Sequence, residues 1–437
     1  MAVANTPFDL VVIGGGFAGL AAAHEALKNG KAVCVVEARL RAGGLASGTE
    51  IGSDWSVDNF YHHWFESDSH IFDFLSELNL EKNIVKCEVE TGVLTDSGCF
   101  KLDSASALFK FPLFGIISKF RFLLFLAICW LPLNPHFLHR ITAKNFISFV
   151  CGRKVYDVLW APLLRSKFEK YAEEISAAWI YKKINLRSRN SSGKGESLYY
   201  YAGGFQKCVD DVVDFVRSKG CNFEFGINVL DVVKENKFFH LKCSDGSEII
   251  SNKILVSSRR SALTLMKDWL PNDVRQKYSE FKSMANVCVA LTLEAPISKF
   301  YWLSNCSSSS DWVAVIEHTN LVSREHYDGR HIVYLSRYIS PNSDFYNLSN
   351  GDLIENAVSF ITNHFPHISQ NQVTLEKCIV NRAIETQPVI SSSKYRYFFP
   401  YMFEDWGVLS MEQIFPEDRG TNYAVREGKK VYHELMA

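Results

Sequence analysis

The chain begins with two short apolar runs separated by an alanine-rich stretch. Residues 8–13 (FDLVVI) are almost entirely apolar and rich in β-branched side chains, which predicts a buried parallel strand. Residues 18–29 (AGLAAAHEALKN) have helical spacing, and Gly30 is placed to end that helix. Residues 32–36 (AVCVV) predict a second buried strand, which ends on Glu37. The pattern therefore predicts a strand–helix–strand unit.

Three glycines lie between the first strand and the helix, at the spacing Gly14-x-Gly16-x-x-Gly19. Gly14 makes a tight turn, Gly16 lets the backbone approach a pyrophosphate, and Gly19 lets helix and strand pack closely. The helix N-terminus offers free N–H groups and partial positive charge to phosphates. Glu37 can accept hydrogen bonds from ribose hydroxyls and would repel a 2′-phosphate. This order predicts a dinucleotide site, and a glycine-rich turn without a ligand is the alternative.

A second apolar segment, residues 109–133, is rich in Phe and Leu. Lys119 and Arg121 interrupt it, and Pro132 ends the last apolar run of about a dozen residues, which is shorter than the roughly 20 that span a bilayer. The segment fits a core helix pair, the wall of an apolar substrate pocket or a monotopic membrane face. The core or pocket interpretation is favoured, and peripheral membrane contact stays open.

The length and charge of the chain limit its class. A chain of 437 residues predicts two domains, and 47% hydrophobic residues with a net charge of −1 predict a globular protein that does not bind nucleic acid. Eleven cysteines without metal-like spacing predict no metal site and a reducing compartment. The strand beginning at Phe8 leaves no room for a signal peptide. We therefore expect a cytoplasmic protein, with membrane association as the open alternative.

A glycine doublet follows the first unit in residues 39–47 (RLRAGGLAS). This segment resembles the flavoprotein amine oxidase superfamily, which includes protoporphyrinogen oxidase, phytoene desaturase and, more distantly, UDP-galactopyranose mutase. In those families it reads R-x-G-G-R-x-x-S/T and lies against FAD. Arg41, Gly43 and Gly44 match the pattern, whereas Leu45 replaces its second arginine. An ordinary loop is the alternative for the doublet.

Residues near the C-terminus carry a further resemblance to the amine oxidases. In that family an acidic residue that binds the ribityl chain of FAD precedes a helix whose N-terminus points at the flavin pyrimidine. Here Ala424 and Gly428 follow Glu412 by 12 and 16 residues, as in the family, although Met411 replaces the family's glycine. A helix N-terminus stabilises the negative charge of a reduced flavin. The FAD contacts implied here are those of Glu412, Asn422 and Tyr423.

Two internal segments extend the resemblance. Residues 200–216 are similar to the element that returns the chain to the FAD domain, and Val229 then lies over the adenine through its backbone. Residues 161–179 resemble a protoporphyrinogen oxidase segment. The implied fold is α/β, with a discontinuous Rossmann-like FAD-binding domain and an inserted α+β substrate domain. The FAD-binding domain takes residues 1–80, 200–290 and 385–437, and the substrate domain takes residues 81–199 and 291–384.

Two adjacent histidines are the first candidates for catalysis. The histidines lie in residues 58–68, and the stretch of the amine oxidases that these residues resemble passes beside the flavin ring. Within them, His63-Trp64-Phe65 is similar to the motif that UDP-galactopyranose mutase has at the same place. Both resemblances place His63 near the flavin, with His62 as the neighbouring candidate. Histidine can accept a proton at neutral pH, and a buried structural pair is the alternative. Lys167 is the candidate for the lysine that many flavin amine oxidases hold near N5.

Basic and aromatic residues flank Gly203 and Gly204 of the segment 200–216. They are candidates to bind an anionic or hydroxyl-rich substrate, and a solvated basic loop is the alternative. These substrate candidates are Arg187, Arg189 and Tyr201. We predict an FAD-dependent oxidoreductase that takes a hydride from a C–N or C–C bond of a small molecule to flavin N5. No second G-x-G-x-x-G motif follows a strand, so oxygen, a quinone or another carrier is the expected electron acceptor.

Two other functions stay open at this point. One is a redox-neutral flavoenzyme of the UDP-galactopyranose mutase type acting on a nucleotide sugar, and the other is a flavin-bearing partner without catalysis.

Overall fold

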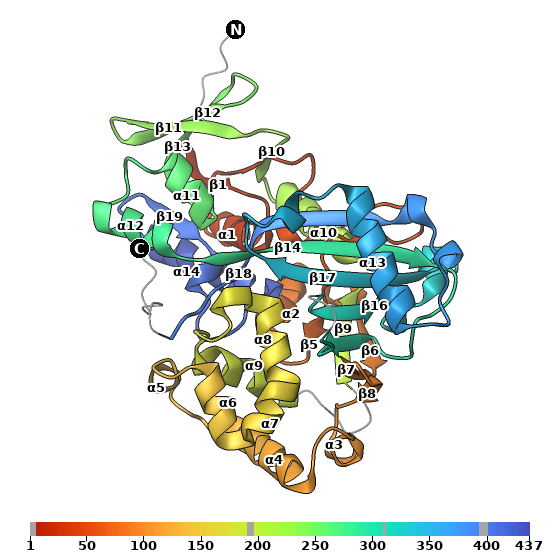
Figure 1. Cartoon of the computed structure of the whole chain (residues 1–437). Coiled ribbons are helices and arrows are strands. Elements are labelled where there is room, and N and C mark those ends of the chain that lie inside the picture. The colour runs from red at the N-terminus through yellow and green to blue at the C-terminus, as the bar shows by residue number, and fades with distance from the viewer. Residues whose placement is uncertain (1–5, 190–195, 309–311, 393–400) are drawn as a thin grey trace.

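The computed structural model describes residues 6–189, 196–308, 312–392 and 401–437, and only the backbone of residues 187–189. Two seven-stranded sheets form its centre, and a group of helices extends from them in the lower part of Figure 1. Within these described ranges, no helix has both the length and the apolar character needed to cross a bilayer.

The first sheet contains the predicted strand–helix–strand unit, as β1 (Phe8–Ile13), α1 (Phe17–Lys28) and β2 (Val33–Glu37). Its order is β10–β2–β1–β13–β12–β11, and β19 pairs with the end of β13 that β12 leaves uncovered. Strands β10, β2, β1, β13 and β19 are parallel, which confirms the Rossmann-like class. The remaining strands are β10 (Asn222–Phe225), β11 (Val229–Glu235), β12 (Phe238–Cys243), β13 (Glu248–Ser257) and β19 (Trp406–Leu409).

Helices cover both faces of this sheet because successive side chains of its strands point in opposite directions. Leu10 and Val12 belong to the hydrophobic cluster that contains α1, α10 and α14. Val11 belongs to the cluster that contains α11 and α12. The bounds are α2 (Ser69–Glu77), α10 (Phe205–Ser218), α11 (Arg259–Leu265), α12 (Asn272–Glu280) and α14 (Thr421–Met436).

The second sheet has the order β18–β14–β17–β16–β15–β7–β8, and α13 (Asn350–His364) packs on it. Its strands are β7 (Thr91–Thr95), β8 (Gly98–Lys101), β14 (Ser283–Leu293), β15 (Trp302–Asn305), β16 (Ala314–Glu317), β17 (His331–Ile339) and β18 (Ile379–Pro388). The predicted boundaries after residues 290 and 384 cut through β14 and β18. Both strands are continuous with this sheet, so the sheets divide the chain nearer residues 282 and 388.

Two small sheets and a helical group complete the fold. The sheets are formed by β3 (Gly48–Thr49) with β4 (Val57–Asp58), and by β5 (Trp64–Phe65), β9 (Glu196–Tyr201) and β6 (Ile84–Val89). The helices of the group are α3 (Ala105–Lys110), α4 (Ile116–Trp130), α5 (Pro135–Leu138), α6 (Ala143–Cys151), α7 (Arg153–Val155), α8 (Ala161–Phe168) and α9 (Ala177–Arg189).

The apolar segment 109–133 contains the end of α3 and all of α4. Phe122, Phe125 and Cys129 of α4 are buried in the core of the helical group, as the core interpretation expects. Other large apolar side chains of the same helix are exposed. Only one side of helix α4 therefore packs in the core, and its other side is exposed.

Candidate active site

A cavity of about 1160 Å³ lies between the two large sheets and the helical group. It begins at the glycine loop before α1 and reaches the side chains of α4 and α8. Single ligand pockets usually measure about 300–1,000 Å³. The cavity is therefore large enough for a cofactor and a substrate together.

The glycine loop forms one end of this cavity. Gly14 has a φ of +114°, which favours glycine. At Gly16 an added Cβ would meet no protein atom within 4 Å, although Gly16 borders the cavity. At Gly19 an added Cβ would lie 2.2 Å from the carbonyl oxygen of Gly14, so this glycine serves close packing of helix and strand. The loop thus leaves open space where the pattern predicts a pyrophosphate.

Glu37 borders the cavity from the end of β2. Its Oε2 accepts a hydrogen bond from the Gly15 N–H at 2.7 Å, and its Oε1 accepts one from the Arg39 N–H at 3.0 Å. These bonds fix the buried carboxylate beside the glycine loop. A carboxylate has further lone pairs, so it retains acceptor capacity for ribose hydroxyls.

The glycine doublet contacts the same loop. The Gly43 N–H donates to the Gly15 carbonyl at 2.9 Å, and Gly43 and Gly44 have φ values of +134° and +56°. Both doublet glycines line the cavity. Arg41 does not, because its guanidinium forms ion pairs with Glu50 and Asp210 outside the cavity.

Helix α14 closes the cofactor end from the opposite side. At Gly428 an added Cβ would lie 2.2 Å from the Ala18 carbonyl oxygen, so α14 and α1 cross in close contact. The first residues of both helices line the cavity, and their N-termini therefore direct partial positive charge toward it. Asn422 lines the cavity but uses its Oδ1 to accept the Ile71 N–H at 3.0 Å, and Tyr423 and Ala424 follow it along the wall.

Glu412 is buried just before α14 and also lines the cavity. Its Oε1 accepts hydrogen bonds from Arg259 Nε at 2.9 Å and from Ser283 Oγ at 3.2 Å, and the Ser410 hydroxyl contacts its Oε2. Protein groups therefore hold this carboxylate in place at the cofactor end.

Besides Arg41, four residues predicted from the sequence are not brought to the cavity in a way that the structure describes. Val229 begins β11 and is absent from the lining, although the nearby Ile227 N–H donates to the Glu37 carbonyl. Tyr201 is wholly buried away from the cavity, because its hydroxyl donates to Asp211 and accepts from Asn83. This burial contradicts the predicted substrate contact of Tyr201. The remaining two substrate candidates, Arg187 and Arg189, have side chains outside the described residues.

His62 and His63 both line the middle of the cavity. His62 Nδ1 lies 2.5 Å from the Phe60 carbonyl oxygen, and burial, with the charge of Arg419, lowers the pKa of His62 to about 4. A carbonyl only accepts, so the neutral ring carries its proton on Nδ1. His63 Nδ1 lies 2.9 Å from the Tyr301 hydroxyl. These contacts fix the orientation of both rings.

A buried charged group lines the same cavity and joins α8 and α9 to the segment before α14. Asp418 Oδ2 lies 3.3 Å from Lys167 Nζ and 2.7 Å from Lys183 Nζ, and its Oδ1 accepts from Trp179 Nε1 at 3.0 Å. Burial lowers the pKa of Lys167, which Asp418 partly offsets. The two lysines hold the pKa of Asp418 well below its usual value although burial alone raises it. Lys167 thus lies in the cavity wall, paired with Asp418, at a position where burial lowers its pKa.

The lining also contains polar atoms that sequence reasoning missed. Within the described part of the chain, buried polar atoms without a hydrogen-bond partner border the cavity at Asn286, Gln387, Arg419 and Glu427. Buried polar atoms are nearly always satisfied, so these positions fit contacts to a bound molecule. They come from β14, β18 and the residues around the start of α14. Asn286 and Gln387 lie in no local motif, and the C-terminal pattern that contains Arg419 and Glu427 assigns a role to neither, so the sequence offered no signal for them.

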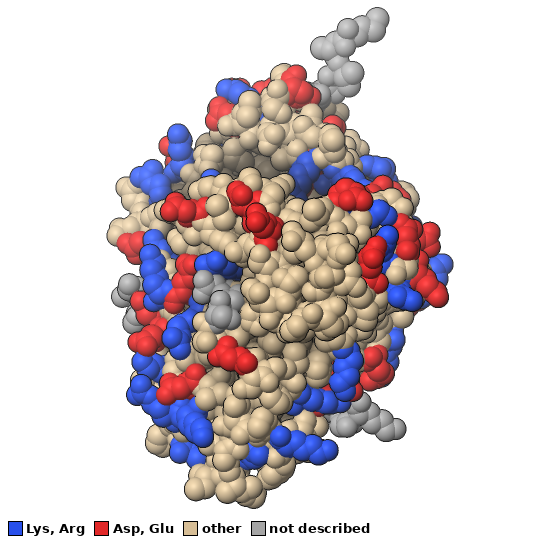
Figure 2. Space-filling view, turned by 45° about the vertical axis from the view of Figure 1, so that its right-hand side comes forward, with Lys and Arg blue, Asp and Glu red and all other residues tan. Residues whose placement is uncertain are grey.

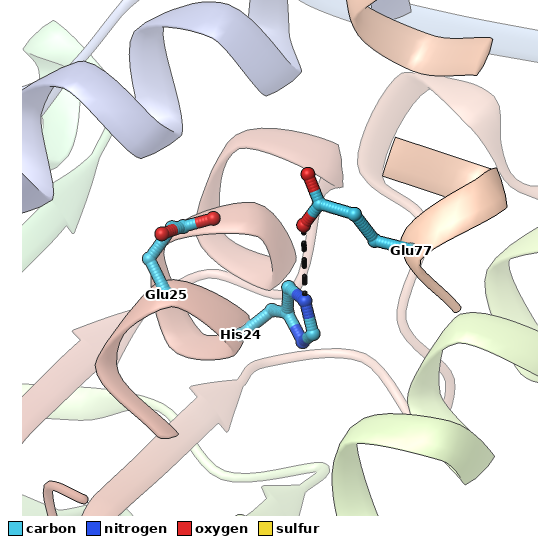
Figure 3. A group of neighbouring side chains, drawn as sticks. All are labelled: His24, Glu25 and Glu77. Carbon is cyan, nitrogen blue, oxygen red and sulfur yellow. Dashed lines mark ion pairs between the residues drawn. The ribbon is translucent and has the colours of Figure 1, made fainter. Parts of the chain in front are cut away.

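A separate cluster has the composition of a metal site. Figure 3 shows His24, Glu25 and Glu77, whose possible ligand atoms lie within 4.8 Å of one another among the described residues. Lys28 Nζ lies 3.1 Å from Glu25 and 3.2 Å from Glu77, and Lys429 Nζ lies 2.7 Å from Glu77. These ammonium groups already compensate the carboxylates. The cluster is therefore an ion-pair network between α1, α2 and α14.

Comparisons with known proteins agree with this geometry. The sequence profile of the family described as flavin containing amine oxidoreductase matches residues 17–402. A pseudooxynicotine dehydrogenase of a Pseudomonas species is 31% identical over 113 residues, which cover 25% of this chain and only 22% of that protein.

Solved structures share the fold. A protein from Exiguobacterium sp. 255-15, with a provisional assignment as a protoporphyrinogen oxidase, is 13% identical and superimposes with a TM-score of 0.74 over 98% of both chains. A reduced UDP-galactopyranose mutase is also 13% identical, with a TM-score of 0.72 over 99% of this chain and 94% of that chain.

Proposed function

Because the chain belongs to the family of flavin-containing amine oxidoreductases and is an FAD-dependent oxidoreductase, we propose that it oxidises a C–N or C–C bond of a small molecule with a large apolar part. The residues at the cofactor end would hold FAD, and its flavin N5 would supply the acceptor for a hydride from the substrate carbon. The observation that carries it is the one continuous cavity, which joins the glycine loop to a chamber lined by apolar side chains of α4 and α8.

The residues present fit FAD at the cofactor end. The open space at Gly16, the fixed carboxylate of Glu37 and the N-termini of α1 and α14 would receive the diphosphate, a ribose and the flavin pyrimidine. FAD, when bound, supplies the acceptor for two electrons. Val229 and Arg41, which do not line the cavity, are left with at most indirect roles in this proposal.

The chain itself supplies orientation, dryness and a proton acceptor. Tyr301 fixes the His63 ring at the cavity wall, so His63 is our candidate to orient the substrate or accept its proton. Lys167, whose pKa burial lowers, is the second basic candidate. Trp179 and Tyr338 line the wall beside Lys167 and exclude water around it. We propose that oxygen, a quinone or another carrier then takes the electrons.

Anaerobic reduction of the FAD-loaded protein tests this function. Candidate amines, porphyrinogens, polyenes and nucleotide sugars are added without oxygen, and the visible absorbance of the flavin is followed. We expect at least one apolar amine, porphyrinogen or polyene to bleach the flavin and air to restore its colour. Isomerisation of a nucleotide sugar only after dithionite reduction, with no net electrons consumed, would instead establish the mutase alternative. An FAD-loaded protein that turns over nothing would favour a non-catalytic flavin protein.

A further inference from the structure

Helix α4 carries an apolar face that no described residue covers. Ile116, Ile117, Phe120 and Leu124 are all exposed, and Ile117 has a relative exposure of 74%. Their spacing places them along one side of the helix. Phe109 of α3 is exposed beside them, since its ring lies 5.8 Å from that of Phe120.

The two basic residues of α4, Lys119 and Arg121, bind backbone carbonyls of the neighbouring helices and so bring further apolar residues to this face. Lys119 Nζ donates to the Phe109 carbonyl at 2.5 Å, and Arg121 donates to the Phe149 and Val150 carbonyls at 2.5 and 2.8 Å. Arg121 therefore holds the end of α6 against α4, where the Phe149 side chain has a relative exposure of 85%. We call the exposed set of Phe109, Ile116, Ile117, Phe120, Leu124 and Phe149 the α4 tip.

Basic residues surround the α4 tip. Between residues 104 and 165 the sequence contains eight Lys or Arg and a single acidic residue, Asp157, although the whole chain has a net charge of −1. Figure 2 shows the lower end of the molecule as tan surface bordered by blue. Protein–protein interfaces are depleted in lysine, whereas an apolar patch ringed by basic residues matches an anionic lipid surface.

The cavity reaches the surface on the same helix. Leu123 and Leu126 of α4 line the cavity from inside. Ala127 and Trp130 of α4 line the cavity and are also exposed to the outside, as is Ala105 of the neighbouring α3. The cavity mouth therefore lies next to the α4 tip, along one helix.

We propose that the α4 tip docks on a bilayer with anionic headgroups and that the cavity takes an apolar substrate from it. The second part rests on the proposed function, and the first does not. The exposed side chains enter the interfacial region, while Arg153, Lys154 and their neighbours lie against the headgroups. A second copy of the chain on the same face is the competing occupant.

Vesicle sedimentation with the full, FAD-loaded chain tests the docking. The vesicles are phosphatidylcholine alone or phosphatidylcholine mixed with phosphatidylglycerol. We expect wild-type protein to sediment with the mixed vesicles, and Ile117→Glu/Phe120→Glu to bind them at least roughly tenfold more weakly. Arg153→Glu/Lys154→Glu should weaken binding to the mixed vesicles alone. Leu230→Glu, at an exposed apolar residue of β11, is the matched control and should bind like wild type.

Three results overturn the proposal. The first is wild-type protein that stays in the supernatant with both kinds of vesicle. The second is a loss of vesicle binding in Leu230→Glu as large as that in Ile117→Glu/Phe120→Glu. The third is a wild-type dimer that does not bind vesicles and that Ile117→Glu/Phe120→Glu dissociates. Phe149→Ser serves as a second variant if the double substitution lowers FAD content. Because sedimentation requires no turnover, a failed docking is distinguishable from a failed oxidase function, which anaerobic bleaching in detergent-free buffer reports separately.

Discussion

The Nδ1 atom of His63 lies 2.9 Å from the hydroxyl oxygen of Tyr301, and this contact joins the loop before β5 to the residue that precedes β15 of the second sheet. The two residues are far apart in the sequence. Their contact fixes the one histidine that both flavoenzyme resemblances place beside the flavin.

We predict that His63→Ala slows anaerobic flavin bleaching by roughly 10²-fold or more, because it removes the group that orients or deprotonates the substrate. Tyr301→Phe should cause a smaller loss, since the ring remains but loses its fixed orientation. Stopped-flow absorbance measures both. His433→Ala, at an exposed histidine, is the control. Bleaching of His63→Ala at the wild-type rate would remove His63 from the mechanism.

Lys167→Met should lower the bleaching rate and remove the acidic limb of its pH profile. Burial lowers the pKa of Lys167, and only the neutral amine accepts a proton, so wild-type activity should fall as pH decreases through that lowered pKa. Rates across a pH series, measured at saturating substrate, test this. An unchanged profile in Lys167→Met would assign Lys167 to the ion pair with Asp418 alone.

Gly16→Val should abolish FAD binding while leaving the fold intact. No protein atom lies within 4 Å of a Cβ at this position, so the added side chain fills only the space that we assign to the pyrophosphate. The flavin absorbance of purified protein and a circular dichroism spectrum report the two effects. Gly115→Ala, which also meets no atom within 4 Å but lies outside the cofactor end, should retain FAD. A yellow Gly16→Val protein would refute the assignment.

Gly428→Ala should destabilise the apoprotein, by roughly 1–3 kcal/mol or more, because its Cβ would lie 2.2 Å from a carbonyl oxygen of α1. Urea unfolding measures the free energy. In Gly351→Ala the nearest atom is 3.7 Å away, so this control should unfold like wild type. Equal stability of both variants would mean that α14 shifts without cost.

Asp58→Asn should flatten the pH dependence of stability between about pH 4 and 7. Burial raises the pKa of Asp58 from 3.8 to about 7, against the hydrogen bonds from Tyr200 and Phe205. The folded chain therefore binds more protons than the unfolded chain in this window, and wild-type stability falls as pH rises through it. The change attributable to Asp58 is a few kcal/mol, at about 1.4 kcal/mol per pH unit. Urea unfolding of wild type and Asp58→Asn at pH 5 and 8 measures the effect. An equal fall in the free energy of unfolding of both proteins between these pH values would contradict the prediction.

Local motifs made the cofactor end predictable from the sequence. The turn at Gly14, the close packing at Gly19 and the acidic residue that ends β2 depend on neighbours within one strand–helix–strand unit. Their spacing along the chain therefore fixes most of their spacing in space.

The substrate end depends on contacts between distant segments, which residue patterns do not report. Arg419 and Asn286 reach the cavity from separate elements and carry no motif of their own. The prediction that Tyr201 contacts the substrate was wrong. The alternation of side chains along β9 directs the Tyr201 ring into the core, where its hydroxyl donates to Asp211. The boundary after residue 290 was wrong because β14 is one continuous strand of the second sheet.

The close crossing of α1 and α14 has a consequence for the order of events during synthesis. Both helix N-termini must be in place before the cofactor end exists, and nearly the whole chain separates them in sequence. While α14 is still inside the ribosome, the nascent chain has the glycine loop before α1 but lacks the other helix N-terminus that lines the cofactor end. We expect flavin uptake to follow translation of α14, so that fluorescence quenching of FAD by stalled nascent chains appears only at lengths that expose this helix.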